Sequence, residues 1–185
     1  MVGRVFQDPL KGTAAEMTIE ENLSLAYMRG KTRRLIPGLN KNRREEFKDI
    51  LSWLELGLED RLEYPVKLLS GGQRQALTLL MATLGSPELL LLDEHTAALD
   101  PKTAVQIIDI TKRIVKKNNL TVLMVTHDMK QALKMGNRTI MMDGGKIILD
   151  IKGDERNKMT VEDLVKKFSE ESGHALTDDR VLLND

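Results

Sequence analysis

A run of four leucines, residues 89–92, ends directly in two carboxylates, Asp93 and Glu94. A short, continuously apolar segment is typical of a β-strand that is covered on both faces in a parallel sheet. A second such segment, 120–126, follows a stretch that opens with helix-start signals at Asp100–Pro101. Alternating strands and helices predict an α/β fold, with the two acids at the carboxyl edge of the sheet, where such proteins bind ligands.

Hydrophobic periodicity predicts helices over 17–28, 42–56 and 70–84, and a further helix that begins after Thr160. Thr18 and Glu21 are spaced as a capping box for the first of these helices. A turn signal at Asp143–Gly144–Gly145 predicts a hairpin over 138–151. The segment between 18 and 70 is therefore expected to be a small helical subdomain.

The segment 31–44 carries six basic residues and no acid, and it is expected to be a solvated loop. Its position in the helical subdomain leaves a second interpretation, which is contact with a permease or with lipid headgroups.

Composition excludes several classes of protein. The 28 basic residues balance the 28 acidic ones, so the chain has no overall field that would attract nucleic acid or an anionic membrane. Cysteine is absent, which removes disulfides and thiolate sites and agrees with a cytoplasmic location. The longest apolar runs fall far short of the roughly 18 residues that a membrane span needs. Any membrane association is therefore expected to occur through a partner.

Several residues have a chemical and a structural interpretation when each is taken alone. Asp93 is able to hold Mg²⁺, directly or through water, and Glu94 is able to activate a water, but acids after a strand also simply begin loops. The segment 69–73, LSGGQ, presents backbone N–H groups at the positive end of a helix, or is an ordinary helix entry. His127 and Gln7 are unremarkable when each is considered singly.

Taken in order, five short motifs resemble those of the ATP-binding-cassette family, the ATPase subunits of ABC transporters. They are VFQDP (Q-loop), LSGGQRQ (signature), LLLLDE (Walker B), AALD (D-loop) and VTHD (switch histidine). The resemblance covers nearly all of residues 1–151. It implies a P-loop NTPase-like parallel sheet with a small helical subdomain at about 18–70. It also implies that 1–151 is a partial ABC ATPase domain, followed by a C-terminal helix and polar tail over 152–185.

The resemblance implies ATP and Mg²⁺ as cofactors, and it gives each hydrolytic residue a role. Asp93 would hold Mg²⁺ through water, and Gln7 would contact both the metal and the attacking water. Glu94 would polarise that water, and His127 would contact the γ-phosphate in the transition state. At position 95 the family commonly has proline, so the histidine found here is expected to be structural.

The resemblance also implies that the sites are composite, each formed by two subunits. Residues of the signature would close over the ATP bound to the opposite subunit; these are Ser70, Gly71, Gly72 and Gln73. Asp100 would lie at the seam of the dimer.

A phosphate-binding loop of the form G-x-x-x-x-G-K-[ST] does not occur in this sequence. The GKT at 30–32 is no substitute, because Leu25 stands where the first glycine is needed and the segment ends a helix. In the family this loop lies upstream of the Q-loop. The resemblance thus implies a cassette that is truncated before the Q-loop and lacks a central strand. We expect the chain alone to bind ATP poorly and to hydrolyse it negligibly.

The leading interpretation is the ATP-hydrolysing subunit of an ABC transporter on the cytoplasmic face of the cell membrane. Its expected partners are transmembrane permease subunits, a second ABC ATPase subunit and a solute-binding protein, with no nucleic acid. The short segment after residue 151 favours an importer. One alternative is a non-transport cassette ATPase in translation or DNA maintenance, although the compact subdomain and the absence of cysteine disfavour DNA repair. Another is a non-catalytic relic.

Overall fold

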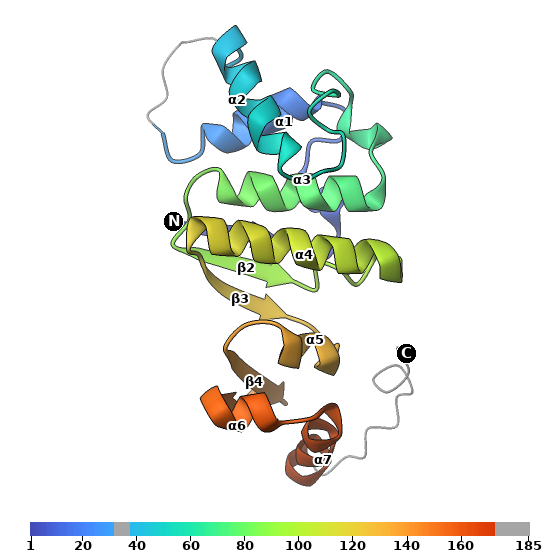
Figure 1. Cartoon of the computed structure of the whole chain (residues 1–185), viewed down its shortest axis with the longest axis vertical. Coiled ribbons are helices and arrows are strands. Elements are labelled where there is room, and N and C mark those ends of the chain that lie inside the picture. Colours follow the sequence, from blue (N-terminus) through green and yellow to red (C-terminus); the bar gives the residue numbers. More distant parts are fainter. Residues whose placement is uncertain (32–37, 173–185) are drawn as a thin grey trace. The chain divides into compact units, whose positions relative to one another are not determined.

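The computed structural model describes residues 1–31 and 38–172, and its contacts divide the chain into two compact units, Met1–Val125 and Thr126–Asp185 (Figure 1). The sequence predicts a division after residue 151, which differs from the division by contacts and stays a prediction. Residues 32–37 of the predicted loop and 173–185 of the predicted polar tail lie outside the described residues.

The first unit alternates helices and strands along the chain. Its elements are β1 (Val2–Val5), the short 3-10 helix η1 (Pro9–Gly12), α1 (Ile19–Tyr27), α2 (Lys41–Ser52), η2 (Val66–Leu68), α3 (Gly71–Thr83), β2 (Leu89–Asp93), α4 (Pro101–Asn118) and β3 (Thr121–Val125). The three strands form one parallel sheet in the order β1-β2-β3. The α/β fold with a parallel sheet is therefore confirmed.

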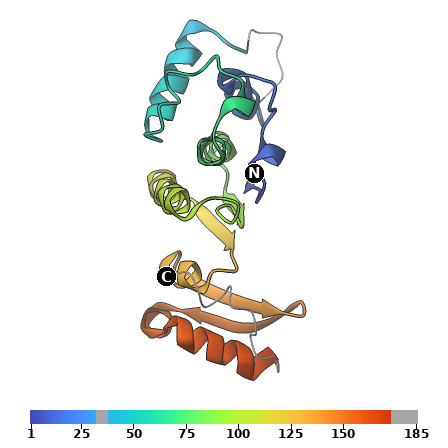
Figure 2. The ribbon, with the colours of Figure 1, turned by 90° about the vertical axis from the view of Figure 1, so that its right-hand side faces the viewer.

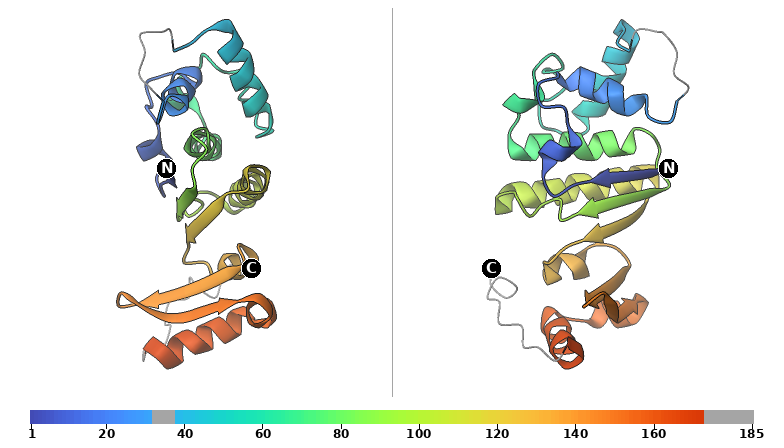
Figure 3. Two further views of the ribbon diagram at one scale, coloured as in Figure 1. Left: turned by 90° about the vertical axis from the view of Figure 1, so that its left-hand side faces the viewer. Right: turned by 180° about the vertical axis from the view of Figure 1, so that it is seen from behind.

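Helices α3 and α4 lie on the same side of this sheet (Figure 2). Their side chains bury one strand face, on which Val5, Leu90 and Leu92 are almost fully enclosed. Within residues 1–31 and 38–125 both crossover helices cover this one face, so the second face of the leucine strand is only partly buried. The other face is seen in front of the helices in the right-hand view of Figure 3, and there Leu123 and Val125 are 53% and 51% exposed.

The helical part of this unit packs a second layer of apolar side chains against α3. Thr18 and Glu21 form the predicted capping box at the start of α1, with the Glu21 N–H donating to Thr18 Oγ1 at 3.2 Å. Helix α2 ends at Ser52 and not at the predicted residue 56. The chain turns away because Glu55 and Gly57 take left-handed backbone conformations, with φ of 56° and 66°.

The second unit contains α5 (Met129–Lys134), β4 (Arg138–Asp143), β5 (Lys146–Lys152), α6 (Gly153–Lys158) and α7 (Val161–Ser172). The predicted hairpin is confirmed, because β4 and β5 pair antiparallel around Gly144 and Gly145, whose φ values of 52° and 76° are positive. The helix after Thr160 is also confirmed as α7. Helix α6 was not predicted.

Arg156, on α6, organises the second unit. The residue is 93% buried, and its guanidinium donates to the carbonyl oxygens of Ala132, Leu133 and Met135 at 3.2, 2.7 and 2.6 Å. These carbonyls lie at the end of α5, where helix carbonyls lack intrahelical partners and carry partial negative charge.

Within the described part of the chain, no helix combines the length and the apolar character that a membrane span requires.

Candidate functional site

Asp93 is the last residue of β2, and its carboxylate is paired with a cation from the neighbouring strand. Arg4 Nη2 lies 2.8 Å from Asp93 Oδ2, and both side chains are about half exposed. The guanidinium of Arg4 also stacks on the ring of Phe6, 4.6 Å from its centroid. Sequence reasoning missed Arg4, because only the pairing of β1 with β2 brings the two residues together.

Glu94 follows in a strained backbone conformation, with φ of 42°. Its N–H donates to Val125 O at 3.0 Å, and its carbonyl accepts from the Ala97 N–H at 2.9 Å. A non-glycine residue in the left-handed region costs roughly 1–3 kcal/mol and persists only where its surroundings enforce it. The carboxylate that is expected to activate water is therefore carried by a backbone held from both sides.

His95 is buried to 98% against α4, as expected of a structural residue. Its Nε2 lies 3.2 Å from Thr111 Oγ1, whose own hydroxyl donates to Ile107 O at 2.7 Å. Because the threonine proton is already used, the imidazole donates from Nε2. Burial lowers the pKa of His95 to about 4, so the ring is neutral at neutral pH.

The signature segment starts α3 with a reciprocal cap. The Gln73 N–H donates to Ser70 Oγ at 3.2 Å, and the Ser70 N–H donates to Gln73 Oε1 at 3.2 Å. Gln73 Nε2 also donates to Leu56 O at 3.2 Å, which connects the signature with the helical layer. The serine and glutamine spacing is a recognisable capping-box signal that sequence reasoning did not use.

The signature lies directly beside the start of α4, which Asp100 caps. A side chain at Gly72 would collide with the Thr103 methyl, so glycine is needed there for the close approach of the two helices. Asp100 Oδ1 accepts from the Thr103 N–H at 3.1 Å. Hydrogen bonds from the Thr103 hydroxyl and N–H hold the pKa of Asp100 below its usual range. The structure thus brings two of the predicted motifs together.

Two further residues of α3 support this region and were missed. Arg74 donates to the carbonyl oxygens of Val66, Lys67 and Leu69, at 3.1–3.4 Å, and so fixes the segment that precedes the signature. Gln75 is 99% buried, and its Nε2 lies 3.5 Å from Phe6 O, at the carboxyl end of β1.

Gln7 follows Phe6 and is exposed in the loop between β1 and η1. The side chain of Asp8 caps η1, accepting from the Leu10 N–H at 2.9 Å. Through Phe6 and Gln75, this loop is joined to the same helix that carries the signature.

His127 belongs to the second unit, two residues after the end of β3, and its side chain is exposed. Asp128 caps α5, accepting from the Gln131 N–H at 2.9 Å, and its own N–H donates to Thr126 Oγ1 at 3.1 Å. These short-range bonds fix the backbone on both sides of the histidine.

The donors fit Mg²⁺ that is shared with phosphates. In residues 1–31 and 38–172, no three His, Cys, Asp or Glu side chains form a group able to hold a metal by themselves. Magnesium is commonly bound through one or two carboxylates plus substrate phosphates and water. Asp93 is a carboxylate of that kind and would exchange Arg4 for the metal, and the amide of Gln7 is a further oxygen donor.

Comparisons with known proteins agree with these motifs. Residues 1–97 match the family described as "ABC transporter". The chain is 48% identical over 168 residues to the tyrosine transport ATP-binding protein of Clostridioides difficile, covering 91% of this chain and 66% of that protein. It is 34% identical over 148 residues to the methionine import ATP-binding protein MetN of Lactobacillus johnsonii, covering 80% of this chain and 39% of that protein. The chain thus spans less than two thirds of the length of these curated relatives.

Two solved structures have the same fold. The ATP-binding cassette MJ0796, in a dimeric post-hydrolysis state bound to ADP and Pi, matches with a TM-score of 0.65 and 31% identity, over 82% of this chain and 62% of that one. The cbiO1 protein of Clostridium perfringens, part of the ABC transporter complex cbiONQ, matches with a TM-score of 0.70 over 91% of this chain and 62% of that one. Its 23% identity supports the fold alone.

Proposed function

The chain belongs to the ABC transporter family, and on that premise we propose that it serves as the ATP-binding, ATP-hydrolysing subunit of an importer. It would work in a dimer with a second ABC ATPase subunit and drive transmembrane permease partners on the cytoplasmic face of the membrane. The names of its relatives support transport, since one is a tyrosine transport protein and another a methionine import protein. A solute-binding protein that delivers the substrate is part of the proposal.

The observation that carries the chemistry is the pair of acids at the end of β2. Asp93 lies at the carboxyl edge of a parallel sheet, and Glu94 directly follows it in an enforced left-handed conformation. In the proposed reaction Asp93, through water, and Gln7 would hold Mg²⁺, which would polarise the γ-phosphate when bound. Glu94 would orient the attacking water and accept its proton, and His127 would contact the γ-phosphate in the transition state.

The signature is proposed to act on ATP bound to the partner subunit. Three features support this: Ser70 is exposed, it stands at the N-terminus of α3, and the start of α4 with its Asp100 cap lies beside it. Because residues 1–185 contain no G-x-x-x-x-G-K-[ST] loop, a homodimer of this chain would complete neither site. We therefore expect calorimetry on the purified chain to detect only weak ATP binding, and tight binding would contradict this expectation.

The proposed composite site is tested with a full-length ABC ATP-binding subunit that has an intact phosphate-binding loop. Its own signature serine is replaced by arginine, so that its homodimer is inactive. Adding the present chain should restore ATP hydrolysis, because Ser70–Gln73 complete one site of the mixed dimer. Adding Ser70→Arg should not restore it.

The matched control is Ser52→Arg, an exposed serine at the end of α2. It makes the same substitution away from the signature and should restore hydrolysis as well as the unchanged chain does. Equal restoration by Ser70→Arg and Ser52→Arg, or no restoration by the unchanged chain, would refute the composite site.

A further inference from the structure

Cations gather around the C-terminal end of α1. Lys31 Nζ lies 3.1 Å from the centroid of the Tyr27 ring, and the Arg43 guanidinium lies 4.3 Å from the same centroid. With Lys11, Arg29 and Lys41 these residues form what we call the basic surface. Lys11, Arg29, Lys31 and Lys41 are exposed.

This charge has little local compensation. From Asn22 to Arg44 the sequence has seven basic residues and no acid, although the whole chain is neutral. Arg44 is paired with Glu20 and Glu63, whereas within residues 1–31 and 38–172 no carboxylate lies within ion-pair distance of the five residues of the basic surface. The dipole of α1 favours cations only near its own end, at Arg29 and Lys31. It gives no reason for Lys11, Lys41 and Arg43.

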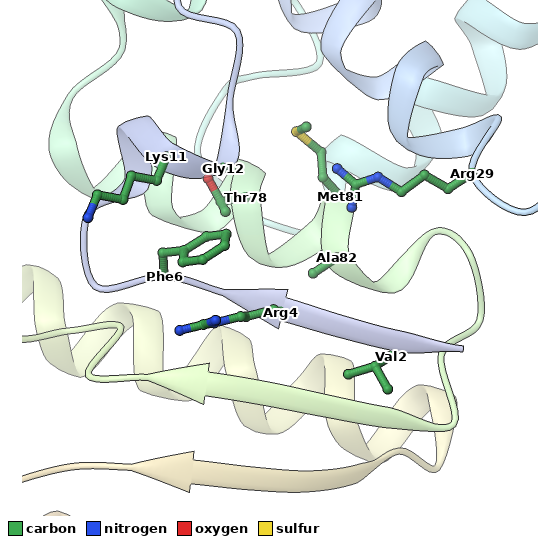
Figure 4. Close-up of a pocket in the computed structure, with 9 residues that line it drawn as sticks. All are labelled: Val2, Arg4, Phe6, Lys11, Gly12, Arg29, Thr78, Met81 and Ala82. Carbon is green, nitrogen blue, oxygen red and sulfur yellow. The ribbon is translucent and has the colours of Figure 1, made fainter.

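A pocket opens within the basic surface. Its volume is about 240 Å³, and it lies between β1, η1 and α3, with Lys11 and Arg29 on opposite sides of its lining and the Phe6 ring between them (Figure 4). Arg4 also lines it but is already engaged by Asp93. Lysine and arginine beside a concave surface suit an oxyanion such as a phosphate.

Exposed leucines accompany the cations. Leu10 precedes Lys11 and is 49% exposed, and Leu25 lies one helical turn before Arg29 and is 57% exposed. Clusters of four or more lysines and arginines beside a membrane bind anionic lipids, and neighbouring apolar side chains add affinity by entering the interface. A soluble polyanion would match the cations but would leave the leucines in water.

We propose that the basic surface docks on the anionic phospholipid headgroups of a membrane, with headgroup phosphates at Lys11 and Arg29 on opposite sides of the pocket. This adds a direct lipid contact to the expectation that membrane association occurs only through partners. It rests on the proposed function in one respect, which is that an importer subunit works beside a membrane. The binding itself needs neither nucleotide nor permease.

The test is sedimentation of the 1–185 chain with lipid vesicles at low salt. Vesicles of phosphatidylcholine with phosphatidylglycerol should bind the chain, pure phosphatidylcholine vesicles should not, and high salt should release it. The triple variant Lys11→Gln, Arg29→Gln, Lys31→Gln should bind about tenfold more weakly or worse. The control triple variant Lys48→Gln, Lys102→Gln, Lys116→Gln has the same net charge and should lose less than about twofold.

Four results would overturn the proposal: no binding to anionic vesicles, equal binding to neutral ones, equal losses in the two triple variants, or displacement by inorganic phosphate or polyglutamate at concentrations that leave ionic strength unchanged. The last would identify a site for free phosphate or for an acidic protein segment. Since the assay contains no ATP, its failure leaves the proposed ATPase function standing, and loss of ATPase activity leaves the lipid contact standing.

Discussion

Protonation of one buried histidine should make the first unit sensitive to mild acid. His95 is enclosed by the core against α4, donates to Thr111, and has a pKa that burial lowers from 6.5 to about 4. The folded chain therefore holds the neutral ring, whereas the unfolded chain takes up a proton near pH 6.5. The stability that the neutral His95 ring contributes is fully present above pH 6.5 and is lost as the pH falls toward 4.

The size of the effect follows from this difference in pKa. One pKa unit corresponds to about 1.4 kcal/mol, so the shift of about 2.5 units sets a limit of roughly 3.4 kcal/mol. Linkage gives a loss in the free energy of unfolding of roughly 1.4 kcal/mol at pH 5.5 and roughly 2.5 kcal/mol at pH 4.5, relative to high pH. That is a large part of the roughly 5–15 kcal/mol that stabilises a typical domain.

Urea unfolding followed by tryptophan fluorescence measures this effect. Trp53 is the only tryptophan in the sequence, it lies in the first unit, and the Lys117 ammonium stacks on its ring in the folded state. The measurement is made in EDTA, because bound metal would add its own pH dependence. Carboxylates also titrate in this range, so the quantity to examine is the difference in the free energy of unfolding between the unchanged chain and His95→Gln. The neutral amide of the glutamine keeps a donor for Thr111.

As the pH is lowered, the unchanged chain should lose free energy of unfolding relative to His95→Gln by the amounts given above. Thr111→Val removes the hydrogen-bond partner but keeps the buried ring, so it should lower the free energy of unfolding by about 1–2 kcal/mol at pH 7.5 and retain the pH dependence. Parallel curves for the unchanged chain and His95→Gln between pH 7.5 and 5.5 would refute the reasoning.

Two further predictions concern strained or buried groups. Glu94→Gly should be more stable than Glu94→Ala by about 1 kcal/mol in the same urea assay, because glycine has no penalty at a φ of 42°; the usual order, with alanine more stable, would show that the backbone relaxes. Arg156→Met should destabilise the second unit by roughly 2–4 kcal/mol, measured by hydrogen exchange of its amides, because it leaves the part-buried carbonyls of Leu133 and Met135 without their side-chain donor. The control Arg138→Met breaks only the exposed pair with Asp150 and should cost far less than Arg156→Met, so similar losses in the two variants would contradict the assigned role of Arg156.

Local capping and turn signals were the part of the fold that sequence predicted best. The box of Thr18 and Glu21, the Asp100 cap and the glycine pair at 144–145 all join residues four or fewer positions apart. Such interactions depend on short-range geometry, so the residue types alone reveal them.

The errors lie where distant residues decide. The end of α2 depends on left-handed turns at Glu55 and Gly57, and helix propensity does not anticipate a left-handed glutamate. Helix α6 is too short for a periodic pattern, and it is fixed by Arg156 reaching across to α5. The four-leucine run correctly predicted a strand, but its composition cannot tell on which side the crossover helices pack.

The same distinction applies to the candidate site. The motifs identified Asp93 and Glu94, but neither the left-handed backbone of Glu94 nor the pairing of Asp93 with Arg4 follows from spacing. Arg4 lies 89 positions away and meets Asp93 only because β1 and β2 are neighbours in the sheet. A sequence pattern names the reacting groups, whereas the sheet register determines what holds them.

Ser70 allows the two roles of the signature to be separated. Capping uses a lone pair of Oγ, which accepts from the Gln73 N–H, so the hydroxyl proton remains for donation to a phosphate oxygen. Aspartate caps helices about as well as serine does, but it has no proton to donate and its charge repels phosphate. The free energy of unfolding of Ser70→Asp should therefore lie within about 0.5 kcal/mol of that of the unchanged chain. The variant should nevertheless fail to restore hydrolysis in the mixed dimer. Ser70→Ala loses the cap and should be less stable by about 1 kcal/mol. If hydrolysis followed helix stability, with Ser70→Asp active and Ser70→Ala impaired, the serine would serve the fold and not the nucleotide.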